Sequence, residues 1–128
     1  MGLHKVLVAD DNADVRKLLR LTLGGQFEII EAEDSATALG LIRSVRPAIV
    51  LLDVMMPGEL DGYQVCEVIR ADPALLGIRV ALVTARGQQT DIQRGGTAGA
   101  DAYIVKPYSP AMLLRQLQSW VAVGDTYP

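Results

Sequence analysis

The sequence is poor in the residues that build thiol and imidazole chemistry: it has one cysteine, Cys66, and one histidine, His4. A single cysteine excludes an internal disulfide. Because Cys66 lies in a helical pattern with Val65 and Val68, we interpret it as a packing residue or an inert surface residue. A single histidine argues against a histidine-rich metal site and against a catalytic triad that needs histidine. The chemistry of this chain must therefore rest on other groups.

Long apolar runs and an excess of positive charge are also absent. No stretch approaches the roughly 18 apolar residues of a membrane span, and the apolar run within residues 1–10 is too short for a signal peptide. The net charge is −3 with both signs interspersed, which leaves no basic surface for nucleic acid and no polybasic patch for a membrane. We therefore expect a soluble cytoplasmic protein with no direct nucleic-acid or membrane partner.

The chain contains enough apolar sequence for one packed domain, since half of its 128 residues are hydrophobic. Short apolar segments alternate with segments of helical periodicity. The predicted strands are residues 5–9, 27–30, 48–52, 78–83 and 102–105. The predicted helices are residues 13–23 with Leu18 on the buried face, a helix capped by Ser35 that runs to 45, a helix capped by Asp61, residues 88–98, and a helix from Ser109-Pro110 to 121. The core then spans about 5–121, with 122–128 as a short tail.

The predicted strands are apolar along their length instead of alternating, and residues 48–52 are the most apolar of all. Strands of this kind are buried on both faces, which predicts a five-stranded parallel sheet covered by helices on each side. The predicted fold class is therefore α/β, a doubly wound three-layer (βα)5 fold of the flavodoxin-like type. Ligands in this architecture bind beyond the carboxyl ends of the strands.

Polar residues follow four of the predicted strands at those ends. The first strand ends in Asp10-Asp11, the third in Asp53, the fourth in Thr84 and the fifth in Lys106. In a parallel sheet these side chains converge on one edge, where three carboxylates would repel one another. A Mg²⁺ ion relieves this conflict, because it prefers oxygen ligands and binds through carboxylates, waters and phosphate oxygens.

A carboxylate can also act as a nucleophile toward phosphorus and form an aspartyl phosphate. Asp53 is the best candidate because it follows the most central and most apolar strand. Phosphoryl transfer needs neutralisation of charge on the phosphoryl oxygens, which a metal, Lys106 and the Thr84 hydroxyl can supply. Taken singly, each of these residues has an ordinary structural explanation as a turn, cap or surface residue, and for Asp61 we favour the helix cap. Their joint placement at four strand ends favours a site.

With these residues placed, the chain resembles the receiver domain of two-component response regulators from about Lys5 to Val121. The motifs that carry the resemblance are residues 8–12 (VADDN), 51–57 (LLDVMMP), 61–63 (DGY), 83–85 (VTA), 98–103 (AGADAY) and 106–108 (KPY). Each motif is weak alone, but their order and combination are specific.

The resemblance implies that Asp53 is phosphorylated by a histidine kinase or a histidine phosphotransfer protein. It implies a Mg²⁺ site formed by Asp10, Asp11, Asp53 and the backbone carbonyl of Met55. In the same family pattern Lys106 pairs with the phosphate, Thr84 binds a phosphate oxygen, and Tyr103 is the switch aromatic that turns inward as the threonine moves. The switching surface would be formed by the fourth helix, fifth strand and fifth helix, acting on a downstream protein or output domain. The Lys106-Pro107 bond is expected to be cis.

Two features depart from the family pattern or stand out against it. Three residues, Gly58-Glu59-Leu60, separate Met-Pro from Asp-Gly where two are usual, so we expect an altered loop shape or partner contact with the chemistry retained. The Gly95-Gly96 pair lies in the predicted fourth helix, where it indicates either a locally weak helix suited to switching or a tolerated pair.

Two other functions compete with this interpretation, which is of a signalling domain that catalyses only its own phosphorylation and dephosphorylation. One is a haloacid-dehalogenase-like phosphatase, which usually has a second aspartate two residues after the nucleophile, where this chain has Met55. The other is a receiver-like interaction module that works without phosphorylation. The complete set of strand-end residues argues against the second alternative.

Overall fold

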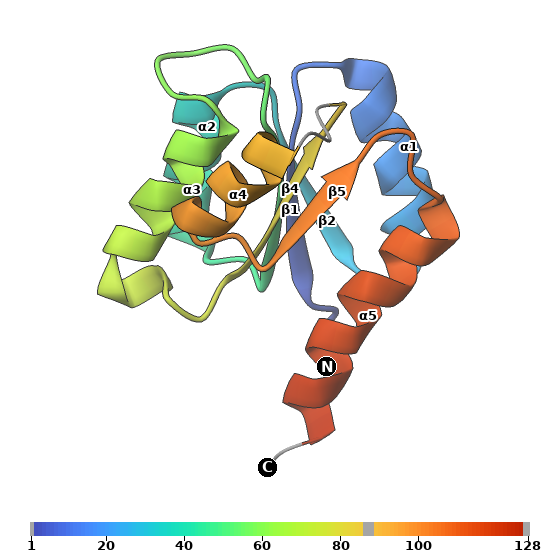
Figure 1. Ribbon diagram of the computed structural model, residues 1–128. Coiled ribbons are helices and arrows are strands. Elements are labelled where there is room, and N and C mark those ends of the chain that lie inside the picture. Colours follow the sequence, from blue (N-terminus) through green and yellow to red (C-terminus); the bar gives the residue numbers. More distant parts are fainter. Residues whose placement is uncertain (1, 86–88, 127–128) are drawn as a thin grey trace.

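The chain forms one parallel sheet between two layers of helices in a computed structural model, which describes residues 2–85 and 89–126 (Figure 1). The strands are β1 (Lys5–Ala9), β2 (Glu28–Ala32), β3 (Ile49–Asp53), β4 (Arg79–Thr84) and β5 (Ala102–Val105). The helices are α1 (Ala13–Leu23), α2 (Ser35–Val45), α3 (Gly62–Ala71), α4 (Gln89–Ala98) and α5 (Pro110–Thr126), with a short 3-10 helix η1 (Pro73–Leu75). The described strands are ordered β2-β1-β3-β4-β5 and all neighbours are parallel. The predicted doubly wound α/β fold is confirmed.

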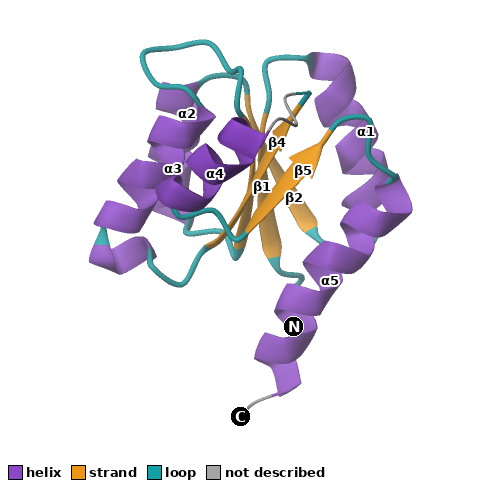
Figure 2. Ribbon diagram, viewed as in Figure 1, coloured by secondary structure: helices purple, strands orange, loops and turns teal. Residues whose placement is uncertain are grey.

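The sheet is apolar on both faces because successive residues of a strand point to opposite sides. In β3, Val50 and Leu52 join the core beneath α2, α3 and α4, whereas Ile49 and Leu51 join the core beneath α1 and α5. Figure 2 shows the helices divided between the two faces in this way. Full burial of one such side chain contributes roughly 1.5–3 kcal/mol. Cys66 is fully buried in the first of these cores, in agreement with its interpretation as a packing residue.

The start of α2 corrects one expectation from the sequence. Ser35 is the first residue of the helix, and the cap is Asp34, whose side chain accepts a hydrogen bond from the Thr37 N–H at 2.7 Å. The Ser35 Oγ instead accepts a hydrogen bond from the Leu60 N–H at 3.4 Å. Both residues are good cap formers by type, so the tertiary contact with the loop before α3 decides which of them caps.

The buried face of α1 also differs from the expectation, because Leu18 lies outside it. Leu18 is 50% exposed, whereas Leu19 is 4% exposed and Leu23 is fully buried. Neighbouring residues of a helix are about 100° apart, so a short apolar run does not define which of two leucines faces the sheet. The packing of α1 on the sheet selects Leu19.

Two elements end two or more residues beyond their expected ends. Strand β2 extends to Ala32, past the expected end at Ile30, because parallel pairing with β1 sets Ala32 opposite Ala9. The backbone of α5 continues to Thr126, past Val121, where we expected the core to end. None of the helices in the described part of the chain combines the length and the hydropathy that a membrane crossing requires.

Candidate functional site

The carboxyl ends of β1, β3, β4 and β5 bring the expected polar residues to one edge of the sheet. Asp10 follows β1, Asp53 and Thr84 end β3 and β4, and Lys106 follows β5. Asp10, Asp53 and Thr84 are buried, whereas Asp11 is exposed. Ligand oxygens from Asp10, Asp11 and Asp53 lie within 4.8 Å of one another. The structure therefore assembles these groups from four separate parts of the sequence.

Lys106 faces both buried carboxylates. Its Nζ lies 3.5 Å from Asp53 Oδ2 and 3.6 Å from Asp10 Oδ2. Partial burial works to lower the pKa of Lys106, but the attraction of Asp53 and Asp10 outweighs it and raises the pKa above its ordinary value. The amine is therefore held as a cation between the two acids. The backbone supports this position, since the Lys106 N–H donates to the Thr84 carbonyl at 2.7 Å. The Lys106–Pro107 bond is cis, as expected.

Burial of Asp10 disfavours its charged form. Burial is the largest cause that raises its pKa, and the charge of Asp53 raises it further. The Asn12 N–H, at 2.9 Å from Asp10 Oδ1, and the Lys106 charge act in the opposite direction but do not cancel the rise. One lysine thus leaves the cluster short of positive charge, and added positive charge at this edge would stabilise the ionised form of Asp10.

Each buried carboxylate keeps one oxygen engaged with the loop that follows it. Asp53 Oδ1 accepts a hydrogen bond from the Met55 N–H at 2.9 Å, just as Asp10 Oδ1 is bound by Asn12. Their Oδ2 atoms are those nearest Lys106. This arrangement fixes the rotamers of both side chains. It also holds the Met55 backbone next to the Asp53 side chain, and the Met55 carbonyl is the metal ligand that the resemblance implies.

Asp61 caps α3, as the sequence predicts. Its side chain accepts from the Gln64 N–H at 2.9 Å, and the Gln64 side chain accepts from the Asp61 N–H at 2.9 Å, which completes a capping box. This reciprocal pair explains the aspartate directly before α3. Asp61 is not among the carboxylates that cluster with Asp53 in the described residues.

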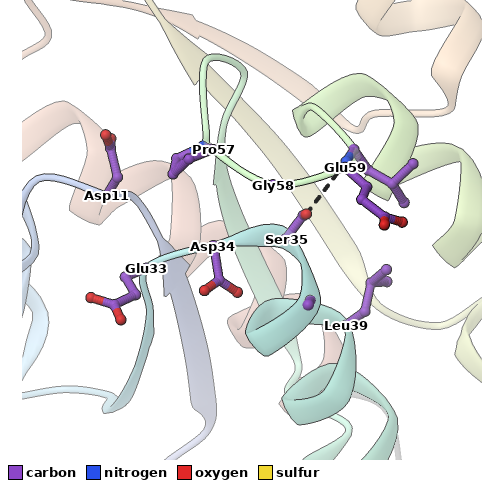
Figure 3. Close-up of a pocket in the computed structure, with 10 residues that line it drawn as sticks. Asp11, Glu33, Asp34, Ser35, Leu39, Pro57, Gly58 and Glu59 are labelled. Carbon is purple, nitrogen blue, oxygen red and sulfur yellow. Dashed lines mark hydrogen bonds between the residues drawn. The ribbon is translucent and has the colours of Figure 1, made fainter.

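The loop with the additional residue packs against the start of α2. Gly58 has φ +119°, and a Cβ there would lie 2.3 Å from Ser35 Oγ, so the turn requires glycine. Figure 3 shows Ser35 bound to this loop, with Asp11, Glu33 and Glu59 around an open groove beside it. The longer loop is accommodated on the α2 side, while Asp53 keeps its place at the end of β3.

Thr84 and Tyr103 lie on the same face of the sheet. Tyr103 is opposite Leu82 in the β4–β5 register, and Thr84 follows Leu82 by two residues, which is the strand repeat. Thr84 is 1% exposed, while Tyr103 is half-buried. The Tyr103 hydroxyl lies 2.8 Å from that of Tyr63 on α3. The expected switch pair is therefore close to α3 as well as to the strand ends.

Two residues of this region were missed at the level of sequence. In the sequence Tyr63 stands out only as part of the Asp-Gly-Tyr motif, which carries no signal of its contact to a residue 40 positions away. The sequence gives Arg16 no distinguishing motif, yet its Nη1 donates to the Asp10 carbonyl at 2.8 Å and its Nε donates to Glu31 at 3.1 Å. Arg16 anchors the loop that carries Asp10. Its position on α1, three residues before the buried Leu19, is the sequence feature that places it near the sheet.

The cluster has carboxylates that can bind a metal cation and a lysine that can bind a negatively charged oxygen. Its polar groups are the carboxylates of Asp10, Asp11 and Asp53 and the ammonium group of Lys106, without thiol or imidazole in the described cluster. Oxygen donors of this type suit a hard divalent cation such as Mg²⁺. The carboxylates of Asp10, Asp11 and Asp53, with ligand oxygens within 4.8 Å of one another, form a donor set that fits such an ion.

Comparison with known proteins gives the family. The family model described as the response regulator receiver domain matches residues 6–118. The chain is 36% identical over 126 residues to the DNA-binding response regulator MtrA of Mycobacterium tuberculosis, which covers 98% of this chain and 54% of that protein. It is 42% identical over 124 residues to the probable transcriptional regulator ycf27 of Porphyra purpurea, covering 95% of this chain and 49% of that protein. The chain thus spans about half the length of these curated relatives.

Solved structures agree with this assignment. A putative response regulator from Chloroflexus aurantiacus superposes with a TM-score of 0.87 and 31% identity, covering 94% of this chain and 99% of that one. A beryllofluoride-activated receiver domain of DrrB superposes with a TM-score of 0.86 and 26% identity, covering 94% and 98%. The chain therefore belongs to the family of response regulator receiver domains, the signalling domains of two-component systems.

Proposed function

We propose that this receiver domain is a phosphorylation switch in which Asp53 accepts a phosphoryl group from a histidine kinase or a histidine phosphotransfer protein. The observation that carries the proposal is the cluster itself: three carboxylates with ligand oxygens within 4.8 Å, and a lysine 3.5 Å from the proposed acceptor. Burial of two of the three acids costs the folded chain stability, because charged carboxylates are taken out of water. Phosphoryl transfer would give each group a role.

Asp53 is the proposed nucleophile. Its Oδ1 is occupied by the Met55 N–H, so Oδ2 is the oxygen available for attack on phosphorus. The P–N bond of a donor phosphohistidine breaks as the P–O bond to Asp53 forms, and the donor imidazole leaves with the electron pair. Lys106 already lies beside that oxygen, where its charge would neutralise a phosphoryl oxygen in the transition state and in the product.

Asp10, Asp11, Asp53 and the Met55 carbonyl would hold Mg²⁺. The ion would supply the charge neutralisation on the phosphoryl oxygens that one lysine leaves incomplete. The protein's own contribution is to hold these oxygen donors in advance. Asp10 is kept in place through Asn12 and through Arg16, which binds the Asp10 carbonyl at 2.8 Å.

The response to phosphorylation would pass through Thr84 and Tyr103. A phosphoryl group adds about −1.5 to −2 charge and strong hydrogen-bond acceptors. The Thr84 hydroxyl would move toward one of these oxygens, and Tyr103, on the same face of the sheet, would follow into the space beside it. The surface formed by α4, β5 and α5 would report the change to a downstream partner or output domain.

The residue at position 55 favours the receiver over the phosphatase alternative. A haloacid-dehalogenase-like enzyme usually places an aspartate two residues after its nucleophile as general acid, and here Met55 is 64% exposed and has no acid function. The proposed domain therefore catalyses only its own phosphorylation and dephosphorylation. Steady hydrolysis of a phosphoester such as p-nitrophenyl phosphate over many turnovers would contradict this.

The test is labelling by acetyl phosphate in the presence of Mg²⁺, measured by intact-protein mass spectrometry. We expect a single phosphoryl adduct in the wild type, none in Asp53→Asn, and full labelling in Asp14→Asn, a matched change on the exposed first turn of α1. Beryllofluoride, which is recorded as the activator of the DrrB receiver domain, should perturb amide resonances at Asp53, Thr84 and Tyr103. Labelling that persists in Asp53→Asn would place the acceptor elsewhere.

A further inference from the structure

Tyr63 lies between the backbone that follows Asp53 and the side chain of Tyr103. The two hydroxyl oxygens are 2.8 Å apart, and the rings are nearly parallel, with centroids 6.4 Å apart and an interplanar angle of 16°. The Tyr63 hydroxyl also donates to the Asp91 carbonyl on α4 at 3.2 Å. A carbonyl only accepts and a phenol has one proton, so in this arrangement Tyr103 is the donor to Tyr63. The pair thus joins α3, α4 and β5.

Tyr63 is itself held firmly. Its side chain is 5% exposed, and the Arg94 guanidinium lies 5.0 Å from the centroid of its ring. Arg94 is oriented in turn by Glu67, one turn further along α3, at 2.8 Å. The Tyr63 ring is held at its hydroxyl by Asp91 and over its face by Arg94, so its hydroxyl oxygen is a rigid hydrogen-bond acceptor for Tyr103.

The backbone next to Tyr63 packs directly on the phosphoacceptor strand end. The Gly62 N–H donates to the Val54 carbonyl at 3.0 Å. A Cβ at Gly62 would lie 2.7 Å from the Asp53 carbonyl oxygen and 2.8 Å from the Val54 Cα, so only glycine allows this approach. Tyr63 is therefore attached to a backbone that packs on the end of β3 at Asp53 with no side chain between them.

Gly95 completes the pocket for Tyr103. A Cβ at this position would lie 2.6 Å from Tyr103 Cδ1 and 3.3 Å from a Leu82 methyl. The absence of a side chain lets α4 lie over the Tyr103 ring while the hydroxyl reaches Tyr63. This gives the first glycine of the Gly95-Gly96 pair a packing reason.

We propose that Tyr63 is a positioning residue for the switch: its hydroxyl oxygen holds Tyr103 in the orientation beneath α4 that the phosphorylated domain uses. The inference rests on the proposed function and adds to it a second route, from Asp53 through Gly62 and Tyr63. Tyr103 here points toward the carboxyl end of the sheet, where α4 begins and where Thr84 lies on the same face. A phosphoryl group that draws Thr84 away and a hydroxyl that anchors Tyr103 therefore favour the same orientation, and each strengthens the other.

The experiment measures the affinity for beryllofluoride in saturating Mg²⁺ by NMR titration of the wild type, Tyr63→Phe, Tyr103→Phe and the double variant. One hydrogen bond of ordinary net strength predicts that Tyr63→Phe weakens the apparent affinity about 2- to 10-fold. Tyr103→Phe removes the other half of the same bond, so the double variant should bind no more weakly than the worse single variant. The Phe side chains keep both rings, and thermal unfolding of each variant is recorded in parallel.

The outcomes separate this inference from the proposed function. A wild type that does not bind beryllofluoride in Mg²⁺ overturns the proposed function. If the wild type binds and Tyr63→Phe binds with equal affinity, the proposed role of Tyr63 is overturned while the proposed function stands. The same conclusion follows if the losses of affinity in the two single variants multiply in the double variant. A lower melting temperature in Tyr63→Phe with unchanged affinity shows a merely structural contact and also overturns it.

Discussion

Replacing the two neighbouring glycines of α4 one at a time separates helix propensity from packing against Tyr103. Both Gly95 and Gly96 lie within α4, so alanine at either position gains up to about 1 kcal/mol of intrinsic helix propensity. Their surroundings differ completely. A Cβ at Gly96 meets no atom within 4 Å, whereas a Cβ at Gly95 meets Tyr103 Cδ1 at 2.6 Å.

The size of the difference follows from these contacts. Two carbon atoms pack best about 3.5–4.0 Å apart, so the Gly95→Ala methyl group must displace the Tyr103 ring by about 1 Å. Overpacking of this kind costs about 1–3 kcal/mol, and a displaced ring also weakens its hydrogen bond to Tyr63. We expect Gly95→Ala to lower the free energy of unfolding by about 1–2 kcal/mol and Gly96→Ala to raise it by about 0.5–1 kcal/mol.

Urea unfolding followed by the fluorescence of Trp120, the single tryptophan, measures both values. The comparison is repeated with Tyr103→Ala, where the ring is missing and Gly95→Ala should no longer be destabilising. Equal stability of Gly95→Ala and Gly96→Ala in the wild-type background would refute the packing of Tyr103 on Gly95. A cost of Gly95→Ala that persists without the ring would refute it as well.

Three further predictions concern ionisable groups. Lys106→Met removes the cation facing Asp53 and Asp10, and we expect a loss of about 1–2 kcal/mol in urea unfolding with EDTA present; an unchanged urea midpoint would contradict this. Burial raises the pKa of Asp10, so the folded chain binds that proton more tightly than the unfolded chain, and stability falls as the pH rises through the raised pKa. Unfolding measured across pH without divalent cations should show this fall in the wild type and a flatter profile in Asp10→Asn; identical profiles would count against it. Burial raises the pKa of the Cys66 thiol to about 11, so iodoacetamide at about pH 8 should modify the folded chain far more slowly than the urea-unfolded chain, and equal rates would show that the thiol is accessible.

The fold could be predicted because its signals are local and repeated. The fully apolar run 49–52, ending at Asp53, indicates a strand buried on both faces. Four further short, mainly apolar segments alternate with helical segments along the chain. Right-handed crossovers and parallel pairing then leave few arrangements, all of which bring the strand ends together. Asp10, Asp53, Thr84 and Lys106 could be nominated as neighbours for this reason alone.

Details that depend on contacts between distant segments could not be predicted. Asp34 and Ser35 are both able to cap α2, and the loop that carries Leu60 decides between them by binding Ser35. Leu18 and Leu19 both fit an apolar stripe, and the sheet buries only Leu19. In each case the local energies are nearly equal, so a contact worth about 1 kcal/mol from elsewhere determines the outcome.

Local pattern therefore predicts the alternation of strands and helices, the parallel sheet and the set of polar residues at its carboxyl edge, because hydrophobic periodicity and the parallel-sheet rule require nothing more. The contact between Tyr63 and Tyr103 and the place of Gly95 against the Tyr103 ring follow from the three-dimensional packing. Those relations depend on the distance between α3, α4 and β5. That distance is set by the packing of whole helices on the sheet and leaves no mark in any one segment of the chain.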